Sequence, residues 1–222
     1  MSDLFEFPTD FPPVPKDDAV LVLTHLQNEF WHPEGKLFEF TGARLPHADT
    51  YERIKKLVAL ARELEIPIIY HKETFRPGFP ELRMDGSRYC LSSQRLFDFP
   101  GTNMAVRGDW GAETLEEIKP REGHPEYEIE NPRVDPFYCT DFDMLLRSMR
   151  RSTLIVVGLA TNLGIEMTAR SATEREYGVV ILEDCIDRMF GEYSEMTVKE
   201  LLPVFSRVMD SETLTSELRS QA

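Results

Sequence analysis

Polar side chains follow several short apolar runs in this sequence. His25 and Gln27 come just after the run at 19–23, and His71 directly follows the run at 68–70. The histidine side chain, whose ordinary pKa is about 6.5, can donate or accept a proton near neutral pH. If these runs are parallel strands, their carboxyl ends meet at one edge of a sheet, where ligands bind in open α/β folds. The pattern therefore predicts a binding or catalytic site at that edge.

Three cysteines are the other candidate reactive groups: Cys90, Cys139 and Cys185. They show no zinc-ligand spacing and cannot all pair within one chain, so we expect reduced thiols in a cytoplasmic protein. Cys139 precedes Thr140, a residue type favoured as the N-cap of a helix, and the N-terminus of a helix favours a thiolate. Cys185 follows a strand, so it could face the same site. Because a lone cysteine is usually a small buried hydrophobic residue, both interpretations stay open.

Short apolar runs alternate with segments of helical periodicity along the chain. We expect strands at 19–23, 68–70, 154–157, 179–182 and 204–209, with a weaker candidate at 127–130. We expect helices at 50–65, 141–149, 163–177 and 194–202. Strands this short and this apolar are typical of a parallel sheet that helices cover on both faces. We therefore predict an α/β fold, a three-layer α/β/α sandwich around a mostly parallel six-stranded sheet of Rossmann-like type.

Two segments interrupt this alternation. Residues 1–18 are acidic and proline-rich, and we expect an extended N-terminal arm that lies on this subunit or on a neighbour. Residues 74–109 form a long irregular stretch rich in glycine, proline, arginine and aromatic residues. A connection of that length is usually a lid, a binding loop or an oligomer contact. The predicted domain spans 19–215 and carries this stretch as an insertion.

The charge balance limits the partners of this chain. Its 222 residues include 39 acidic and 25 basic side chains, for a formal net charge of −14. Binding to phosphate backbones or anionic membranes requires a basic face, so we expect neither a nucleic acid nor a membrane as partner. The N-terminus lacks a signal-peptide pattern, and every apolar run is far shorter than the roughly 20 residues needed to cross a bilayer. We expect a cytoplasmic protein with a small-molecule substrate.

Three segments resemble motifs of the isochorismatase-like family, also called the cysteine hydrolases. Residues 19–30 resemble its opening strand followed by Asp-x-Gln-Asn-Asp-Phe, and residues 130–142 resemble the segment that carries its lysine. Residues 157–172 resemble the strand, loop and helix that carry its cysteine. The resemblance implies the isochorismatase-like fold and a hydrolase or lyase acting on an amide, ester or vinyl-ether bond of a small metabolite. It also implies a homo-oligomer, either a dimer or a tetramer.

The three catalytic positions of that family carry different residues here. Family members use a cysteine nucleophile, an aspartate base and a lysine that holds the aspartate, and the matching positions are Gly164, His25 and Asn131. Isochorismatases of siderophore and phenazine pathways also have glycine at the cysteine position, but they keep the aspartate as an acid. We therefore predict acid/base catalysis without a cysteine. In it His25 transfers the proton, Asn131 positions by hydrogen bonding, and the amides near Gly164 stabilise an anion.

Two alternatives stay open. Either the chain is an inactive pseudoenzyme that binds a small molecule or a partner, or it is a hydrolase with a displaced nucleophile, Cys139. Nicotinamidase-like relatives bind a metal through an aspartate and two histidines on one loop, and this sequence lacks that grouping, so we predict no metal. Gly158 and Gly164 are too far apart for a dinucleotide-binding turn, and we predict no cofactor.

The same edge supplies the predicted substrate-binding residues: Gln27, Phe30, Trp31, His71, Lys72, Arg76, Phe137, Tyr138, Thr161, Asn162, Leu163 and Gly164. The four aromatic side chains either line the pocket or belong to the core. Lys72 and Arg76 either replace the charge of the family lysine or form an exposed basic pair. The resemblance also implies a cis peptide bond between Leu159 and Ala160, in the loop before Gly164.

Overall fold

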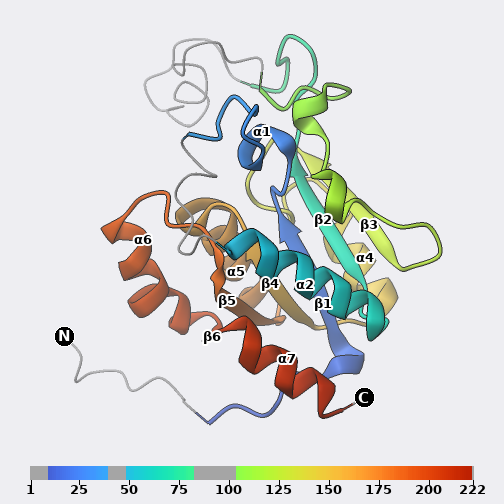
Figure 1. Ribbon diagram of the computed structural model, residues 1–222, viewed down its shortest axis with the longest axis vertical. Helices are drawn as coiled ribbons and strands as arrows, with labels where there is room; N and C mark the ends of the chain where they lie inside the picture. The colour runs from blue at the N-terminus through green and yellow to red at the C-terminus, as the bar shows by residue number, and fades with distance from the viewer. Residues whose placement is uncertain (1–9, 40–48, 83–103, 222) are drawn as a thin grey trace.

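The computed structural model describes residues 10–39, 49–82 and 104–221, and these residues form an α/β fold with one sheet (Figure 1). The strands are β1 (Ala19–Thr24), β2 (Ile68–Glu73), β3 (Glu126–Asn131), β4 (Thr153–Gly158), β5 (Gly178–Ile186) and β6 (Arg207–Met209). They lie in the order β3-β2-β1-β4-β5-β6, and every neighbouring pair is parallel. The predicted six-stranded α/β fold is confirmed, with a sheet that is parallel throughout.

Helices cover both faces of the sheet (Figure 1). The helices α2 (Thr50–Glu63) and α7 (Ser211–Arg219) lie on one face, and α4 (Phe142–Met149) and α5 (Glu166–Thr173) lie on the other. The shorter helical segments are α1 (Asn28–Trp31), α6 (Glu192–Met196), π-helical turns at Thr161–Ile165 and Thr197–Leu201, and 3-10 turns at Lys16–Asp18, Trp110–Ala112, Glu116–Ile118 and Leu202–Val204. The layers are therefore helix, sheet and helix, as predicted.

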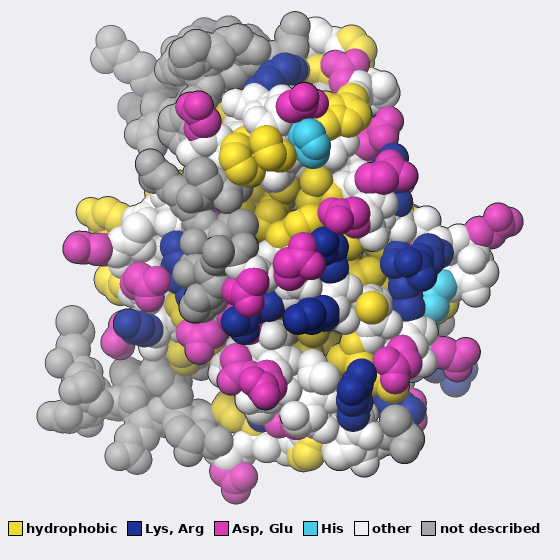
Figure 2. Space-filling view, viewed as in Figure 1, with side chains coloured by type: hydrophobic (Ala, Val, Ile, Leu, Met, Phe, Trp, Pro, Cys, Tyr) yellow, Lys and Arg dark blue, Asp and Glu magenta, His cyan; other side chains and the backbone are white. Residues whose placement is uncertain are grey.

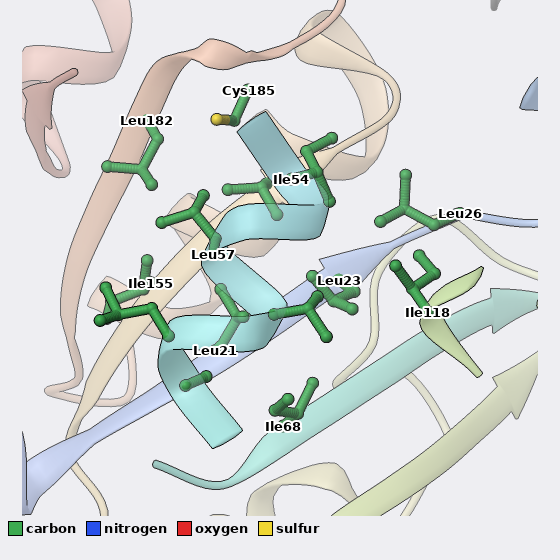
Figure 3. Close-up of a cluster of buried hydrophobic side chains, with 14 of the residues drawn as sticks. Leu21, Leu23, Leu26, Ile54, Leu57, Ile68, Ile118, Ile155, Leu182 and Cys185 are labelled. Carbon is green, nitrogen blue, oxygen red and sulfur yellow. The ribbon is translucent and has the colours of Figure 1, made fainter. Parts of the chain in front are cut away.

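Side-chain alternation along the strands divides the core between two layers. Leu21 of β1 packs with Ile54 and Leu57 of α2 (Figure 3), whereas Val22 lies in the opposite cluster with Leu146 of α4. Successive strand side chains point to opposite faces, so a strand covered on both faces needs an uninterrupted apolar run. Burying each such side chain contributes about 1.5–3 kcal/mol. The sheet is thus a well-packed frame beneath the loops at its carboxyl edge.

The direction of the strand order reverses between β1 and β4. In doubly wound sheets the ligand crevice forms at such a switch point, outside the carboxyl ends of the strands. His25 directly follows β1, and Leu159 directly follows β4. The topology therefore places the two polar segments that follow these strands side by side.

Two predicted helices have different limits in the structure. The helix expected at 163–177 begins at Thr161 with a π-helical turn and ends at Thr173. The segment expected as a helix at 194–202 consists of α6, a π-helical turn and a 3-10 turn that contains Pro203. Proline has no N–H to continue a helical ladder. Because the 3-10 turn includes Val204, β6 covers only Arg207–Met209 of the strand expected at 204–209.

The described part of the N-terminal arm lies on its own subunit. The backbone N–H of Val14 donates to Glu217 of α7 (2.9 Å), and the guanidinium of Arg207 lies over the ring of Phe11 (5.5 Å). Residues 1–9 of the predicted arm lie outside the described residues. The predicted domain end, residue 215, falls inside α7, whose Leu218 is buried. The limits of the arm and of the domain stay predictions.

The two ends of the predicted insertion at 74–109 lie side by side. The N–H of Phe75 donates to the carbonyl of Ala105 (3.0 Å), and the N–H of Arg107 donates to the carbonyl of Phe75 (2.8 Å). Residues 83–103, which include Cys90, lie outside the described residues. The described ends therefore join the carboxyl edge of the sheet just beyond β2.

Acidic and basic side chains are interspersed over the face of the molecule in Figure 2. Many are paired, as Lys55 is with Glu117 (3.0 Å) and Lys119 with Glu113 (2.9 Å). Basic side chains on this face thus stand beside acidic neighbours. The described ranges contain no helix with the length and apolar character needed to cross a membrane.

Candidate active site

His25 lies at the switch point, directly after β1. Its backbone has a left-handed conformation (φ 54°), which is uncommon for a residue other than glycine, and its N–H donates to the carbonyl of His71 (2.8 Å). The side chain is only 4% exposed, and both ring nitrogens are buried without a hydrogen-bond partner among the described residues. His25 is therefore a buried imidazole with both polar atoms available to a ligand.

Gly164 lies against His25. A Cβ atom at this position would stand 3.0 Å from Nε2 of His25 and 2.7 Å from the carbonyl oxygen of Leu159. Real Cβ atoms do not come this close to such atoms without a shift of the surroundings. The imidazole of His25 thus occupies space that a side chain at residue 164 would need, and glycine makes room for it.

His71 and Asn131 continue the site along the ends of β2 and β3. The Nε2 atom of His71 lies 3.0 Å from Oδ1 of Asn131, and the Asn131 amide nitrogen donates to the carbonyls of Asp135 (2.9 Å) and Tyr138 (3.0 Å). Because the amide nitrogen faces two carbonyls, Oδ1 is the acceptor and Nε2 of His71 carries the hydrogen. Nδ1 of His71 then carries a lone pair, and it is buried with no partner among the described residues. The His71 ring lies 4.7 Å from the ring of His25.

Burial determines the charge of both histidines. It lowers the pKa of His25 well below the usual 6.5, and the neighbouring His71 lowers it further. Burial also lowers the pKa of His71 to about 4, although the hydrogen bond to Asn131 acts in the opposite direction. Both imidazoles are therefore neutral near pH 7, which suits a proton acceptor better than a proton donor.

Glu73 adds a buried carboxyl group to the same edge. It lies two residues after His71 on β2, so both side chains point to the same face, and it pairs in register with Asn131 of β3. Burial raises the pKa of Glu73 to about 7, although the charge of Arg133 lowers it. The carboxyl group therefore titrates near neutral pH, and we did not include it among the site residues predicted from sequence. The two-residue spacing from His71 was the signal that could have identified it.

Gln27 holds the backbone of this edge together. Its amide nitrogen donates to the carbonyls of Glu73 (2.9 Å) and Ala112 (3.1 Å), and its Oε1 accepts from the N–H of Glu73 (2.9 Å). All the polar atoms of the side chain are occupied by main-chain partners. These bonds join the β1 segment to β2, and contact of Gln27 with substrate stays a prediction.

The loop after β4 contains a cis peptide bond between Leu159 and Ala160, where the family resemblance places it. The hydroxyl of Thr161 donates to the carbonyl of Asp187 (2.6 Å), and the amide nitrogen of Asn162 donates to the Thr197 hydroxyl (2.6 Å). These two side chains, predicted to bind substrate, instead tie the loop to the segments after β5. Their partners are too distant in sequence for any local pattern to have identified them.

The amides on either side of Gly164 are already engaged. The N–H groups of Leu163 and Ile165 both donate to the carbonyl of Ala160 (2.9 and 3.1 Å). The prediction that amides near Gly164 stabilise an anion therefore does not extend to these two groups. The Leu163 side chain is exposed, whereas Gly164 is buried.

Lys72 does not replace the family lysine. Its ammonium group pairs with Glu130 (2.7 Å) and Glu128 (3.0 Å) of β3. Adjacent residues on a strand point to opposite faces, so Lys72 lies on the face opposite to His71. Burial lowers the pKa of Lys72, but the hydrogen bonds to the two glutamates raise it more, so the ammonium stays charged. Lys72 is thus engaged by two glutamates on the other face of the sheet, and its contact with substrate stays a prediction.

The four predicted aromatic residues have different surroundings. The ring of Phe30 packs edge-on against His25, with ring centroids 6.1 Å apart, and it belongs to the core cluster beneath α2. Trp31 packs on Tyr51 in the core beneath α2 (6.0 Å). Phe137 packs on Phe142 of α4 (4.7 Å) in the opposite core layer. Trp31 and Phe137 are thus core residues rather than part of a substrate wall.

A cavity of about 300 Å³ lies beside Asn131. Its charged wall consists of three arginines and two glutamates, and the remaining wall includes a tyrosine and a cysteine: Arg76, Arg107, Arg133, Glu81, Glu130, Tyr138 and Cys139. The predicted residues Arg76 and Tyr138 therefore line the cavity together with Asn131. Arg107, Arg133 and Glu81 come from irregular loops, and sequence analysis did not single them out.

The two described cysteines differ in position. Cys139 is exposed in the wall of the cavity, whereas Cys185 is fully buried in the core near Ile54 and Leu182 (Figure 3). Burial raises the pKa of the Cys185 thiol, so that thiol stays protonated. The prediction that Cys185 faces the site is wrong, because it lies within β5 on the side covered by α2. Within the described ranges, no three His, Cys, Asp or Glu side chains are grouped so that they could hold a metal ion.

A model of the isochorismatase domain family matches residues 19–213, a range that includes all three motif segments. The chain belongs to the isochorismatase family. In this member of the family, His25 and Gly164 lie near the switch point between β1 and β4, and Asn131 ends the edge strand β3.

Several curated proteins are similar over most of the chain. A ureidoacrylate amidohydrolase RutB from Yersinia enterocolitica is 26% identical over 206 residues, which cover 90% of this chain and 88% of that protein. A protein of the same name from Methylobacterium radiotolerans is 28% identical over 183 residues, covering 78% of this chain and 69% of that protein. Both of these relatives carry the name of a hydrolase.

Solved structures of the isochorismatase type share the fold. A cysteine hydrolase from Pseudomonas syringae pv. phaseolicola has a TM-score of 0.79 at 23% identity, covering 98% of this chain and 100% of that chain. An N-carbamoylsarcosine amidase from Thermoplasma acidophilum has a TM-score of 0.67 at 24% identity, covering 88% and 97%. At these sequence identities the likeness shows the fold alone, and the reaction has to be inferred from the residues of this chain.

Proposed function

We propose that this protein hydrolyses a small metabolite with an amide or ester bond, and that His25 replaces the cysteine chemistry of its relatives. The observation that carries the proposal is the position of the His25 ring, whose Nε2 lies 3.0 Å from where a Cβ atom of residue 164 would stand. The imidazole thus takes the place of the side chain that attacks the substrate elsewhere in the family.

The surroundings of His25 suit a general base. Both ring nitrogens are buried without a partner among the described residues, and an unsatisfied buried polar atom costs about 1–3 kcal/mol. A water or substrate atom that hydrogen-bonds to these nitrogens removes that cost. Because burial keeps the ring neutral near pH 7, one nitrogen is free to accept a proton. A vinyl ether needs a proton donor at the start of its reaction, so the neutral ring favours amide and ester substrates.

In the proposed reaction the unprotonated nitrogen of His25 takes a proton from water, and the water oxygen attacks the carbonyl carbon of the substrate. The bond to the leaving nitrogen or oxygen then breaks, and the imidazolium returns the proton to the leaving group. Asn131 is a positioning residue, because its Oδ1 accepts from Nε2 of His71 and holds that ring beside His25.

The names of the relatives support an amide-type bond. The Yersinia and Methylobacterium relatives are called amidohydrolases, and they cover most of this chain. Small linear amides, carbamoyl compounds and esters are therefore the first substrates to test. The oligomeric state and a cytoplasmic location remain part of the same proposal, and both follow only from the family resemblance and the composition.

The decisive experiment is turnover of an amide and ester panel by wild type and by His25→Gln. We expect the substitution to lower kcat/KM by about 10²–10⁴-fold, the usual contribution of a positioned base. His124→Gln is the matched control, because His124 lies at the amino end of β3, beside Glu126 (3.2 Å). A His25→Gln protein that is folded and keeps the wild-type rate would overturn the role of His25.

A pseudoenzyme is the second candidate, since all three triad positions of the family are substituted here. If wild type turns over nothing in the panel while the combined His25→Asp, Asn131→Lys and Gly164→Cys variant gains amidase activity, the chain is a binding protein. A displaced nucleophile predicts a different result. It requires that Cys139→Ser abolish turnover, whereas the His25 mechanism predicts less than a tenfold loss.

A further inference from the structure

The cavity beside Asn131 is basic in an otherwise acidic chain. Three arginines and two glutamates line it, although the whole chain carries a net charge of −14. Arg76 follows β2, Arg107 comes from the far end of the insertion, and Arg133 follows β3. Three separate segments therefore bring guanidinium groups to one small space at the carboxyl edge of the sheet.

Two of these guanidinium groups have no carboxylate partner among the described residues. Arg107 pairs with Glu130 (3.4 Å) and donates to the hydroxyl of Thr74 (3.1 Å). Arg133 donates instead to main-chain carbonyls, those of Pro132 (2.6 Å) and Glu81 (3.4 Å). The side chain of Arg76 is exposed and makes no hydrogen bond to another described residue. Arg76 and Arg133 thus keep charge for an anion that comes from outside the chain.

Glu81 adds a negatively charged hydrogen-bond acceptor to the same cavity wall. One of its carboxylate oxygens accepts from the backbone N–H of Arg76 (2.7 Å). The other, Oε2, is buried and has no partner among the described residues. A buried carboxylate oxygen without a donor is costly, so a ligand that brings an N–H group to it is favoured.

We propose that this cavity holds a small amide that carries a carboxylate, with the carboxylate on Arg76 and Arg133 and an N–H group on Glu81. The volume of about 300 Å³ falls at the small end of ligand cavities, which excludes large conjugates. Guanidinium groups match the planar, two-oxygen shape of a carboxylate. Because the Glu81 carboxylate repels a second anion, we expect an anion without an N–H group to bind less tightly.

Asn131 connects this cavity to the histidines. Its side chain lines the cavity and also holds His71, whose ring lies 4.7 Å from that of His25. Two side chains, Asn131 and His71, therefore link a ligand in the cavity to the proposed base. That the cavity is a substrate subsite rests on the proposed function. Binding of a ligand there can be measured without any hydrolysis.

Cys139 makes this binding measurable without catalysis. Its thiol is exposed in the cavity wall, whereas Cys185 is buried. The probe is succinamate, which has a carboxylate and an amide N–H group. Succinamide lacks the carboxylate, and monomethyl succinate lacks the N–H group. The readouts are the rate of iodoacetamide alkylation at Cys139, resolved by peptide mass spectrometry, and calorimetric titration.

We expect succinamate to slow alkylation of Cys139 and to bind at least tenfold more tightly than either analogue. Arg76→Met and Arg133→Met should each weaken succinamate binding at least fivefold. Arg147→Met is the matched control and should bind normally, because Arg147 is an exposed residue of α4 paired with Asp143 (2.9 Å). Glu81→Gln should remove the preference for succinamate over monomethyl succinate.

Equal binding of succinamate and succinamide, or no protection of Cys139, would overturn the subsite. So would unchanged binding by both arginine variants. His25→Gln separates the two proposals, because it should bind succinamate as wild type does. If the subsite binds but no amide is turned over, the subsite stands and the proposed hydrolysis fails. If amides are hydrolysed with no dependence on a carboxylate, hydrolysis stands and the subsite fails.

Discussion

Two buried polar clusters lie at opposite ends of the neighbouring strands β2 and β3. Near the amino end, the Glu126 carboxylate accepts from Nε of Arg62 (2.8 Å) and from the hydroxyl of Tyr70 (2.6 Å). At the carboxyl end, His71 hydrogen-bonds to Asn131, but its Nδ1 has no partner among the described residues. The first cluster satisfies its charged groups within the chain, whereas the second leaves polar atoms for something else.

The ionisation states of the two clusters differ in the same way. Burial alone raises the pKa of Glu126, but the hydrogen bonds from Arg62 and Tyr70 lower it more, so the carboxylate stays ionised. At the other end burial dominates, and it keeps His71 neutral and raises the pKa of Glu73 to about 7. A buried polar group that pairs within the chain supports the fold. A buried ionisable group whose pKa is shifted mainly by burial is typical of a functional site.

Breaking the paired cluster should have the largest effect on stability. Arg62→Met leaves the Glu126 charge buried with only part of its partners, and we expect the free energy of unfolding to fall by about 3–5 kcal/mol. Urea denaturation followed by circular dichroism measures this change. Arg147→Met removes an exposed ion pair and should cost less than about 1 kcal/mol. Equal losses in the two variants would contradict the contrast between the clusters.

Acid should destabilise the protein through the unpaired cluster. His71 has a pKa of about 4 in the folded protein and 6.5 when unfolded. Its contribution is therefore fully present above pH 6.5 and is lost as the pH falls through 4, amounting to about 3 kcal/mol. His25, whose pKa is also lowered, acts in the same direction.

The measurement is the free energy of unfolding of wild type and His71→Gln between pH 7 and pH 4. The variant should lose less stability over this range, because a glutamine does not titrate. Lys56→Met, at an exposed position of α2, should keep the wild-type slope. Parallel curves for wild type and His71→Gln would show that the imidazole is not buried in its neutral form.

The contact between Gly164 and His25 should give the smallest effect. Gly164→Ala adds a Cβ atom 3.0 Å from Nε2 of His25 and 2.7 Å from the carbonyl of Leu159, and we expect a loss of about 1–3 kcal/mol. His25→Ala should relieve only the first of these contacts. The double variant should therefore be less destabilised than the sum of the single ones, as unfolding in urea can measure. Strict additivity would mean that the two residues do not share space.

Local patterns were sufficient for most of the fold. The apolar run at 19–23 predicted β1, because a strand covered on both faces buries every side chain. The helical spacing of Ile54 and Leu57 predicted α2, because both residues lie on the face of the helix that packs on the sheet. The segment around Pro203 was predicted less well, since competing π-helical and 3-10 turns differ little in local pattern. Of the predicted site residues, Gly164 lies against His25 and Asn131 bonds to His71, whereas Lys72 pairs with Glu128 and Glu130 on the opposite face.

The sequence by itself determined the layer architecture and the family, because apolar periodicity and motif spacing are local properties of the chain. Only the tertiary structure decided which polar residues remain available. Thr161 hydrogen-bonds to Asp187, which follows β5. His71 stands between His25 and Asn131, and its Nδ1 has no partner in the described part of the chain. Hydrogen-bond partners and desolvation depend on segments far apart in sequence, so no local pattern encodes them.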